Sequence, residues 1–279
     1  MRFLCHLAPV IFLIGCIPAE PLHRVSKPNP LATSSQVAVA KNEAAPPPAQ
    51  TPAIPARATS VEISGIRFEG VSFDSRNHRL VVADQAAGPG SQFSDSQSAA
   101  RAFQGLAAIN AGFFTPEGAP LGLVVARGKV AGAWNTASSL GSGAWYQSQA
   151  GTTAITRREK LGRTAASAMR ELIQAGPLLV ENGQAVTGLE TTKTSARSMI
   201  LWDGGTRWWI GCSSPCTLAE LGRALAYGQT AAWPVRHALN LDGGRSTDLW
   251  ISDSIAGGPL LRRPPWNRPV RNFLVLVPR

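Results

Sequence analysis

The segment 238–250, ALNLDGGRSTDLW, places reactive and hydrogen-bonding side chains where an apolar stretch ends. Asn240 and Asp242 alternate, so in an extended backbone both side chains point to the same side. Gly243 and Gly244 allow the chain to turn with positive φ and allow a ligand to approach the backbone. A guanidinium and two hydroxyls follow, from Arg245, Ser246 and Thr247. This pattern predicts a catalytic or binding site, and the alternative is a glycine turn in which Asp242 only caps local amides.

Three familiar catalytic motifs do not fit the sequence. Residues 244–248 resemble the G-x-S-x-G nucleophile elbow, but Asp stands where the second Gly belongs. His237, Asp242 and Ser246 fall within ten residues, whereas catalytic triads are usually assembled from separate segments. The run GLVVARGKV has five residues between its glycines and no Ser or Thr after Lys129, so it is not a phosphate-binding loop.

Other polar residues stand where expected strands begin or end, far from this segment in the sequence. Asn110 ends the apolar run GLAAI, Gly176 opens the run GPLLVENG, and Arg197 begins the strand-like run SARSMILW. A site built from these residues would be assembled from several separate segments of one domain.

Short alternating segments separated by glycine-rich turns predict a strand-rich domain. Single strands are expected at 65–73, 78–84 and 272–278. Hairpins are expected at 121–134 with a turn at Arg127-Gly128, at 176–186 with a turn at Asn182-Gly183, and at 198–212 around 203–205. The Asn-Gly pair is a strong signal for a type I′ turn.

Three segments have the pattern of helices. They are 95–105 with Asp95 or Ser94 as N-cap, 165–176 ending at Gly176, and 217–228 with a Thr217–Glu220 capping box. Many hairpins with few helices predict an α+β fold with mixed or antiparallel sheets rather than a doubly wound sheet.

The N-terminus predicts an exported protein. Residues 1–16 contain one early Arg and an apolar run that suits a signal peptide and is too short to span a membrane. The run ends in Leu-Ile-Gly-Cys, which resembles a bacterial lipobox with Cys16 as the lipidated residue, and an ordinary secretory signal is the alternative. Residues 17–60 are rich in Pro and Ala and predict an extended tether, which leaves 61–279 as one domain.

Cys212 and Cys216 are the cysteines that remain after this processing. An oxidising envelope favours a disulfide between them. A metal pair is the alternative, although two thiols without an adjacent His make a poor zinc site.

The formal net charge is +10, and basic residues are spread through the domain. This charge favours solubility and attraction to an anionic envelope surface. The sequence contains no basic helix or aromatic RNA-binding signature, which argues against a nucleic-acid partner.

Seven short motifs in a fixed order resemble the phosphodiester glycosidase family over about residues 60–279. They read INAGFF, PLGL, GPLLVENG, SARSMI, TLAEL, ALNLDGGRST and RPVRNFLVLV. The resemblance implies hydrolysis of a sugar joined through its anomeric carbon to a phosphodiester. It also implies a polar site at Asn110, Arg197, Asn240 and Asp242, with the glycine turn beside it.

The implied reaction suits these residue types. Its leaving group is a phosphate monoester with a second pKa of about 6, so protonation matters less than for an ordinary glycoside. Asp242 is expected to stabilise or trap the oxocarbenium-like carbon, and Arg197 is expected to hold the departing phosphate.

The remaining residues are expected to bind the sugar. Asn110 and Asn240 would contact its hydroxyl groups, and Gly176 would lie beside them. Phe113 or Phe114 would stack on the ring, with core packing as the alternative.

The sequence departs from the family pattern in two places. Arg245 replaces the third glycine of Asn-Leu-Asp-Gly-Gly-Gly-Ser; it does not easily adopt positive φ and would add a cation for the phosphate. After Arg197, residues 198–201 read Ser-Met-Ile-Leu where the family pattern has Thr-Ala-Ile-Gly. Both changes bear on substrate choice.

The sequence therefore predicts a hydrolase that acts on glycosyl phosphodiesters of envelope or exopolysaccharide-type glycans. The alternative is a polysaccharide-binding lipoprotein without catalysis. The expected location is the bacterial cell envelope, with a lipid anchor in the membrane and the domain facing the periplasm or the exterior. No cofactor is predicted, a role for a divalent cation is left open, and the sequence gives no oligomeric state.

Overall fold

The computed structural model describes residues 54–279, which belong to the compact unit Gln50–Arg279. The expected signal peptide, the lipidation site at Cys16 and residues 17–53 of the expected tether lie outside the described residues. The first strand already includes 57–60, which the sequence assigns to the tether. None of the helices in the described part is long and apolar enough to cross a membrane.

The largest sheet has seven strands, and every neighbouring pair in it is antiparallel. Their order is β1 (Arg57–Ile63), β2 (Ile66–Asp74), β13 (Arg207–Cys216), β12 (Ser195–Trp202), β14 (His237–Asn240), β10 (Leu178–Glu181) and β11 (Gln184–Ala185).

Two five-stranded sheets complete the strand framework, again with antiparallel pairs. The second sheet has the order β16 (Leu260–Arg262), β15 (Leu249–Ile251), β4 (Ala107–Asn110), β17 (Asn272–Pro278) and β3 (His78–Asp84). The third has the order β6 (Lys129–Ala131), β5 (Val124–Ala126), β9 (Glu171–Ala175), β7 (Gly143–Gln147) and β8 (Thr153–Arg157). The three expected single strands and the three expected hairpins are confirmed.

The described helices are short. They are α1 (Ser96–Ala102), α2 (Arg158–Leu161), α3 (Arg163–Ser167) and α4 (Leu218–Tyr227), with 3-10 turns η1 (Ser139–Gly141) and η2 (Gly244–Ser246). Asp95 caps α1 by accepting a hydrogen bond from the Ser98 N–H, and the Thr217–Glu220 capping box begins α4, both as predicted. The α+β class is consistent with this structure, with four helices rather than three.

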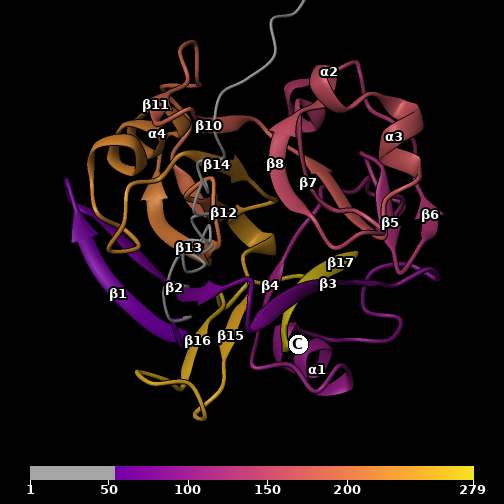
Figure 1. Ribbon diagram of the computed structural model, residues 1–279, viewed down its shortest axis with the longest axis horizontal. Helices are drawn as coiled ribbons and strands as arrows, with labels where there is room; N and C mark the ends of the chain where they lie inside the picture. Colours follow the sequence, from indigo (N-terminus) through magenta and orange to yellow (C-terminus); the bar gives the residue numbers. More distant parts are fainter. Residues whose placement is uncertain (1–53) are drawn as a thin grey trace, which may run out of the picture. The chain divides into compact units, whose positions relative to one another are not determined.

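The three sheets share one central core, to which Ile210, Leu274 and Ile173 contribute from the first, second and third sheet respectively. Figure 1 shows the sheets arranged around this centre, with α4 against β10 and α1 against β4. A second core lies between the first sheet and α4, and we call it the α4 core.

Strand β13 is fixed by adjacent tryptophans that face opposite ways. Trp208 lies in the central core and Trp209 in the α4 core, and both are almost completely buried. Truncating a buried tryptophan typically costs about 3–5 kcal/mol. Because β12 pairs with β13 from Trp202 to Arg197, this strand also fixes the start of β12.

The helix predicted at 165–176 is wrong. Helix α3 ends at Ser167, and Glu171–Ala175 forms strand β9, which pairs with β5 and β7. All five residues of β9 are buried, so the segment has no solvent face of the kind an amphipathic helix shows. A short apolar run suits either element in isolation, and here pairing in the third sheet decides.

The predicted disulfide is also wrong, because Cys212 and Cys216 are both free thiols. They lie four positions apart on β13. At about 3.3 Å per residue in an extended strand, their Cα atoms are about 13 Å apart, whereas the Cα atoms of a disulfide are roughly 4.4–6.8 Å apart. A bulge in the β12–β13 pairing sends Cys212 into the central core and Cys216 into the α4 core. Burial raises the pKa of the Cys212 thiol to about 12, so it stays protonated.

We expect both thiols to resist alkylation in the folded protein and to react fully in denaturant without reductant. The tryptic peptide 208–223 contains both cysteines, so its mass after iodoacetamide treatment reports them together. The same sample treated with reductant is the control. A peptide that becomes alkylated only after reduction would restore the disulfide.

Candidate active site

A pocket of about 420 Å³ lies where the start of β12, the end of β14 and the segment before β10 meet. This volume is in the usual range of small-molecule sites, roughly 300–1,000 Å³. Five residues predicted from the sequence line it: Phe113, Arg197, Asn240, Asp242 and Gly243. The structure therefore brings together segments that are far apart in the chain.

Asp242 is a buried carboxylate at the wall of this pocket, with 9% of its surface exposed. Its N–H donates to the Ala111 carbonyl at 2.9 Å, and the Gly243 N–H donates to its Oδ1 at 2.9 Å. Burial raises the pKa of Asp242 to about 6, against the lowering effects of a Ser246 hydrogen bond, the Arg268 charge and the Gly243 N–H. The group is thus mainly ionised above about pH 6.

The two glycines after Asp242 serve different purposes. Gly244 has a φ of +60°, as expected for the turn. Gly243 has a φ of −133°, so the expectation of positive φ at this residue is wrong. A Cβ on Gly243 would lie 2.6 Å from the Ala196 carbonyl oxygen, which means that close packing against β12 requires a glycine here.

Asn240 lines the pocket and has one side-chain acceptor without a partner in the described part of the chain. Its Nδ2 donates to the Gly176 carbonyl at 2.9 Å, and its backbone N–H donates to the Pro177 carbonyl at 3.1 Å. Its Oδ1 is buried and has no hydrogen-bond partner among residues 54–279. Gly176 therefore orients Asn240 through its carbonyl, and only the neighbouring Pro177 lines the pocket.

Asn110 lies behind the site and does not line it. It is completely buried, and its Nδ2 donates to the Asp242 carbonyl at 2.6 Å. Its Oδ1 accepts from the Ser198 hydroxyl at 2.6 Å and from the Asp248 N–H at 3.1 Å. This geometry favours a positioning role for Asn110 over the sugar contact expected from the sequence.

Arg197 lines the pocket but is engaged with the backbone. Its Nη2 donates to the Lys193 carbonyl at 2.7 Å and its Nε to the Cys216 carbonyl at 3.3 Å. Burial lowers the pKa of Arg197, and the charge of Glu190, which also lines the pocket, partly offsets that effect. Glu190 is itself held by the N–H groups of Thr192 and Lys193.

The two phenylalanines expected near the sugar have different surroundings. Phe113 lines the pocket. Phe114 does not; its ring lies under the Arg268 guanidinium, whose central carbon is 4.8 Å from the ring centroid, and it packs against the core around α1.

The residues after the glycines point in different directions. Ser246 is buried and hydrogen-bonds the Asp242 carboxylate. Arg245 is exposed, and its Nε donates to the Trp266 carbonyl at 3.2 Å, away from the pocket. Thr247 lines a different pocket. The structure thus joins Ser246 to Asp242 but does not bring Arg245 or Thr247 to the same pocket.

Sequence reasoning missed Arg268, Ser198 and Lys193. Arg268 belongs to the motif RPVRNFLVLV, which was the available signal. Ser198 was noted only as a departure from the family pattern, although its hydroxyl holds Asn110. Lys193 stands in a polar loop with no distinguishing pattern.

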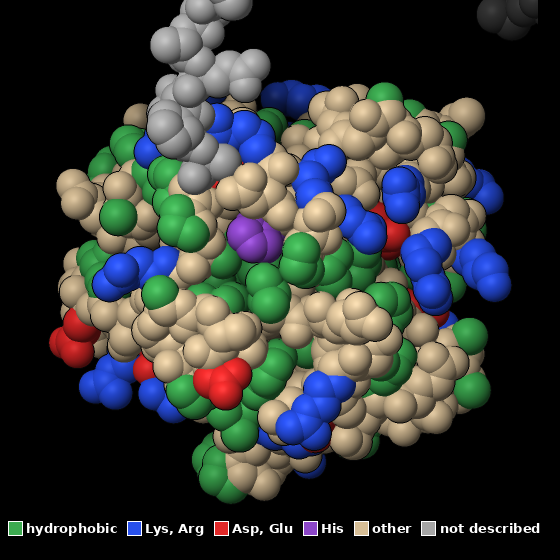
Figure 2. Space-filling view, turned by 60° about the horizontal axis from the view of Figure 1, so that its bottom comes forward, with side chains coloured by type: hydrophobic (Ala, Val, Ile, Leu, Met, Phe, Trp, Pro, Cys, Tyr) green, Lys and Arg blue, Asp and Glu red, His purple; other side chains and the backbone are tan. Residues whose placement is uncertain are grey.

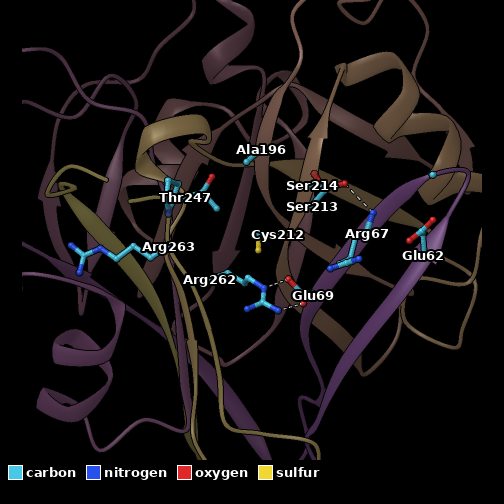
Figure 3. A pocket seen from close by; sticks show the side chains of 12 residues that line it. Glu62, Arg67, Glu69, Ala196, Cys212, Ser213, Ser214, Thr247, Arg262 and Arg263 are labelled. Carbon is cyan, nitrogen blue, oxygen red and sulfur yellow. Dashed lines mark hydrogen bonds and ion pairs between the residues drawn. The ribbon is translucent and has the colours of Figure 1, made fainter. Parts of the chain in front are cut away.

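A second pocket, of about 460 Å³, lies on the other side of β12, where Ala196 and Thr247 line it (Figure 3). Two of its guanidinium groups are already paired: Arg262 contacts Glu69, and Arg263 lies 3.2 Å from Asp95. Cys212 faces this pocket with a protonated thiol. It contains neither Asp242 nor Asn240, so the Asp242 pocket is the better candidate for catalysis.

Basic side chains are spread over the surface rather than gathered at one site. Figure 2 shows Lys and Arg at many places on one face, and Asp and Glu at few. Within the described residues, no group of three or more His, Cys, Asp or Glu side chains could hold a metal ion.

Comparisons with known proteins identify a similar family of sequences and similar folds. A family model described as "Phosphodiester glycosidase" matches residues 104–277, which include every residue of the Asp242 pocket. No protein in a curated sequence collection matches the chain significantly.

Two solved structures show a similar fold. The zebrafish N-acetylglucosamine-1-phosphodiester α-N-acetylglucosaminidase catalytic domain, auto-inhibited by its pro-peptide, is 18% identical with a TM-score of 0.56, over 83% of this chain and 85% of that chain. A hypothetical protein from Synechocystis is 19% identical with a TM-score of 0.53, over 80% of this chain and 61% of that chain. At these identities the likeness concerns the fold.

Proposed function

Because the chain belongs to the phosphodiester glycosidase family, we propose that it hydrolyses sugars joined through the anomeric carbon to a phosphodiester. The observation that carries the proposal is the buried Asp242 carboxylate in a pocket also lined by Asn240, whose buried Oδ1 has no hydrogen-bond partner in the described residues. A carboxylate stabilises positive charge at an anomeric carbon, and a free acceptor binds a sugar hydroxyl.

In the proposed reaction, the bond between the anomeric carbon and the phosphate oxygen breaks, and its electron pair leaves with the phosphate. Asp242 acts in its ionised form, either as nucleophile or as the counter-charge for the oxocarbenium-like carbon. Water supplies the hydroxyl group of the free sugar. The leaving phosphate monoester has a second pKa of about 6, so it departs without strong help from a general acid.

The other groups position the substrate and the carboxylate. Asn240 accepts a hydrogen bond from a sugar hydroxyl, and Phe113 offers an apolar surface to the ring. Gly243 lines the pocket beside Asp242 and packs closely against Ala196 of β12. Asn110 and Ser246 hold the Asp242 backbone and carboxylate, so that the group does not have to reorganise during the reaction.

Incubation with a panel of glycosyl phosphodiesters, including UDP-linked sugars, tests this function through release of free reducing sugar. Envelope or exopolysaccharide-type glycans with phosphodiester-linked sugars are the expected natural substrates. Tight glycan binding with no turnover across the panel would instead support the polysaccharide-binding alternative.

We also propose that the protein is an exported lipoprotein anchored through Cys16, on the basis of the Leu-Ile-Gly-Cys run and the Pro/Ala-rich segment after it. Cys16→Ala should move the protein from the membrane fraction to the soluble fraction. A wild-type protein that is already soluble after cell fractionation would contradict the anchor.

A further inference from the structure

Arg268 lies between β16 and β17, outside the lining of the Asp242 pocket, and carries its guanidinium beside Ser246. Its Nε is 3.4 Å from the Ser246 hydroxyl oxygen, and that hydroxyl bonds the carboxylate. The charge of Arg268 also acts directly on Asp242. Arg268 is therefore part of the Asp242 surroundings, although it is 26 positions away in the sequence (268 − 242).

The segment that carries Arg268 is fastened to the glycine turn. The Arg268 N–H donates to the Arg245 carbonyl at 3.2 Å. Asn267 Nδ2 donates to the carbonyls of Arg245 and Thr247 at 2.9 and 3.1 Å. With the Phe114 ring under it, the guanidinium has a defined position, and Arg245 serves to hold this segment through the Trp266 carbonyl.

The Arg268 guanidinium is still available to a ligand. The residue is exposed, and its two Nη groups have no hydrogen-bond partner in the described part of the chain. No carboxylate of residues 54–279 lies within 4.0 Å of it. A planar guanidinium with free N–H groups binds two phosphate oxygens at once, which an ammonium does not do as well.

Arg197, to which the sequence assigned the phosphate, is less free. Two of its N–H donors already bond to backbone carbonyls, and the Glu190 carboxylate acts on it. Each guanidinium has one carboxylate near enough to act on it, Glu190 for Arg197 and Asp242 for Arg268, so the two arginines differ in how many of their N–H donors are already bonded.

From this arrangement we propose that Arg268 binds the phosphate group of the substrate, with Phe114 and Ser246 holding its guanidinium in place. The inference rests on the proposed function and names its anion site. The ligand class is a phosphodiester before the reaction and a phosphate monoester after it. Phe114 then supports the phosphate site and does not form a platform for the sugar.

Inorganic phosphate is the probe that separates this inference from turnover. Its affinity for the full chain is measured by isothermal titration at constant ionic strength, with Arg268→Met, Arg268→Lys and Arg67→Met. Arg67 is a matched control because it is an exposed arginine that lines the second pocket. We expect phosphate binding to weaken about 10-fold or more in Arg268→Met, less in Arg268→Lys, and not at all in Arg67→Met.

Each outcome decides between the alternatives. Loss of affinity in Arg67→Met but not in Arg268→Met would place the anion in the second pocket and overturn the inference. The same holds if the wild type binds no phosphate, or if Arg268→Met shifts only the pH profile of kcat/KM, because Arg268 would then act solely on Asp242. Phosphate binding that depends on Arg268 without any turnover would support the anion site and count against the proposed hydrolysis.

Discussion

Asp242→Asn should reduce kcat/KM on a glycosyl phosphodiester by at least about 10³-fold, because the carboxylate that meets the anomeric carbon is lost. The same change should make the protein more stable at neutral pH. Activity falls while stability rises because the buried Asp242 carboxylate is needed for catalysis but lowers the free energy of unfolding.

The sign of the stability effect follows from the pKa of Asp242, which folding raises from 3.8 to about 6. Well below pH 3.8 the group is protonated in both states and costs nothing, and well above about pH 6 it is ionised in both. Between these values the unfolded state loses its proton first, so stability falls as pH rises. The full shift corresponds to about 3 kcal/mol.

The Asn substitution removes this ionisation cost. Its amide accepts the hydrogen bond from the Gly243 N–H only through the oxygen, so this bond is lost when the amide nitrogen faces that N–H. We therefore expect a net gain of about 1–2 kcal/mol at pH 7, which would raise Tm by a few degrees. At pH 4 most of the gain should be lost, because Asp242 is then largely protonated in the folded state and about half ionised in the unfolded state. Thermal denaturation of both proteins across pH 4–8, with kcat/KM at each pH, measures both effects.

Asp203→Asn is the matched control. Asp203 holds the β12–β13 turn through Gly205 and Arg207 and is not part of the pocket. Replacing the Asp203 carboxylate should lower Tm and leave kcat/KM unchanged. If Asp242→Asn also lowers Tm and keeps activity, Asp242 only caps local amides and the site lies elsewhere.

The parts of the fold that the sequence predicts well depend on neighbouring residues. The Asn182-Gly183 turn needs two positive φ angles, which the structure has at 51° and 80°, and the capping box of α4 is complete within four residues. In both cases the residues of the motif themselves determine the local structure. The residues Glu171–Ala175 do not, because their apolar run suits either a helix or a strand, and pairing with β5 and β7 makes it a strand.

The candidate site shows the same division. Asn240 and Asp242 could be placed on one side of a strand because alternation is local. The direction of Arg245 and the importance of Arg268 depend on how a segment about 20 residues later packs on the glycine turn. The cysteines mislead for a related reason: closeness in sequence suggests a bond, but an extended strand keeps them apart.

Asn110 and Asn240 look alike in the sequence, yet the structure predicts different consequences when each is replaced by Ala. Asn110→Ala removes three buried hydrogen bonds and leaves the Asp242 carbonyl, the Ser198 hydroxyl and the Asp248 N–H without their partner. At about 1–3 kcal/mol for each of the three unsatisfied groups, the expected cost is about 3–9 kcal/mol. That is a large share of the stability of a typical domain, about 5–15 kcal/mol.

Asn240→Ala should cost less stability, about 1–3 kcal/mol, since it leaves one buried group, the Gly176 carbonyl, without its partner. Its Oδ1 has no protein partner to leave behind, so the main loss falls on the substrate. We expect kcat/KM to fall about 10- to 100-fold through KM, kcat or both, with a smaller fall in Tm than in Asn110→Ala.

Ser198→Ala tests the role of Asn110 in a protein that still folds, because it removes only one of the three partners of that side chain. The expected cost is about 1–2 kcal/mol, with substrate KM unchanged. Urea denaturation gives the stability of all three variants, and steady-state kinetics gives KM and kcat for those that fold. If Asn110→Ala is stable with a raised KM and Asn240→Ala has normal kinetics, then Asn110 contacts the substrate and Asn240 has the structural role. In that case Asn110 would have to reach the substrate from its buried position, which requires the glycine turn to move when substrate binds.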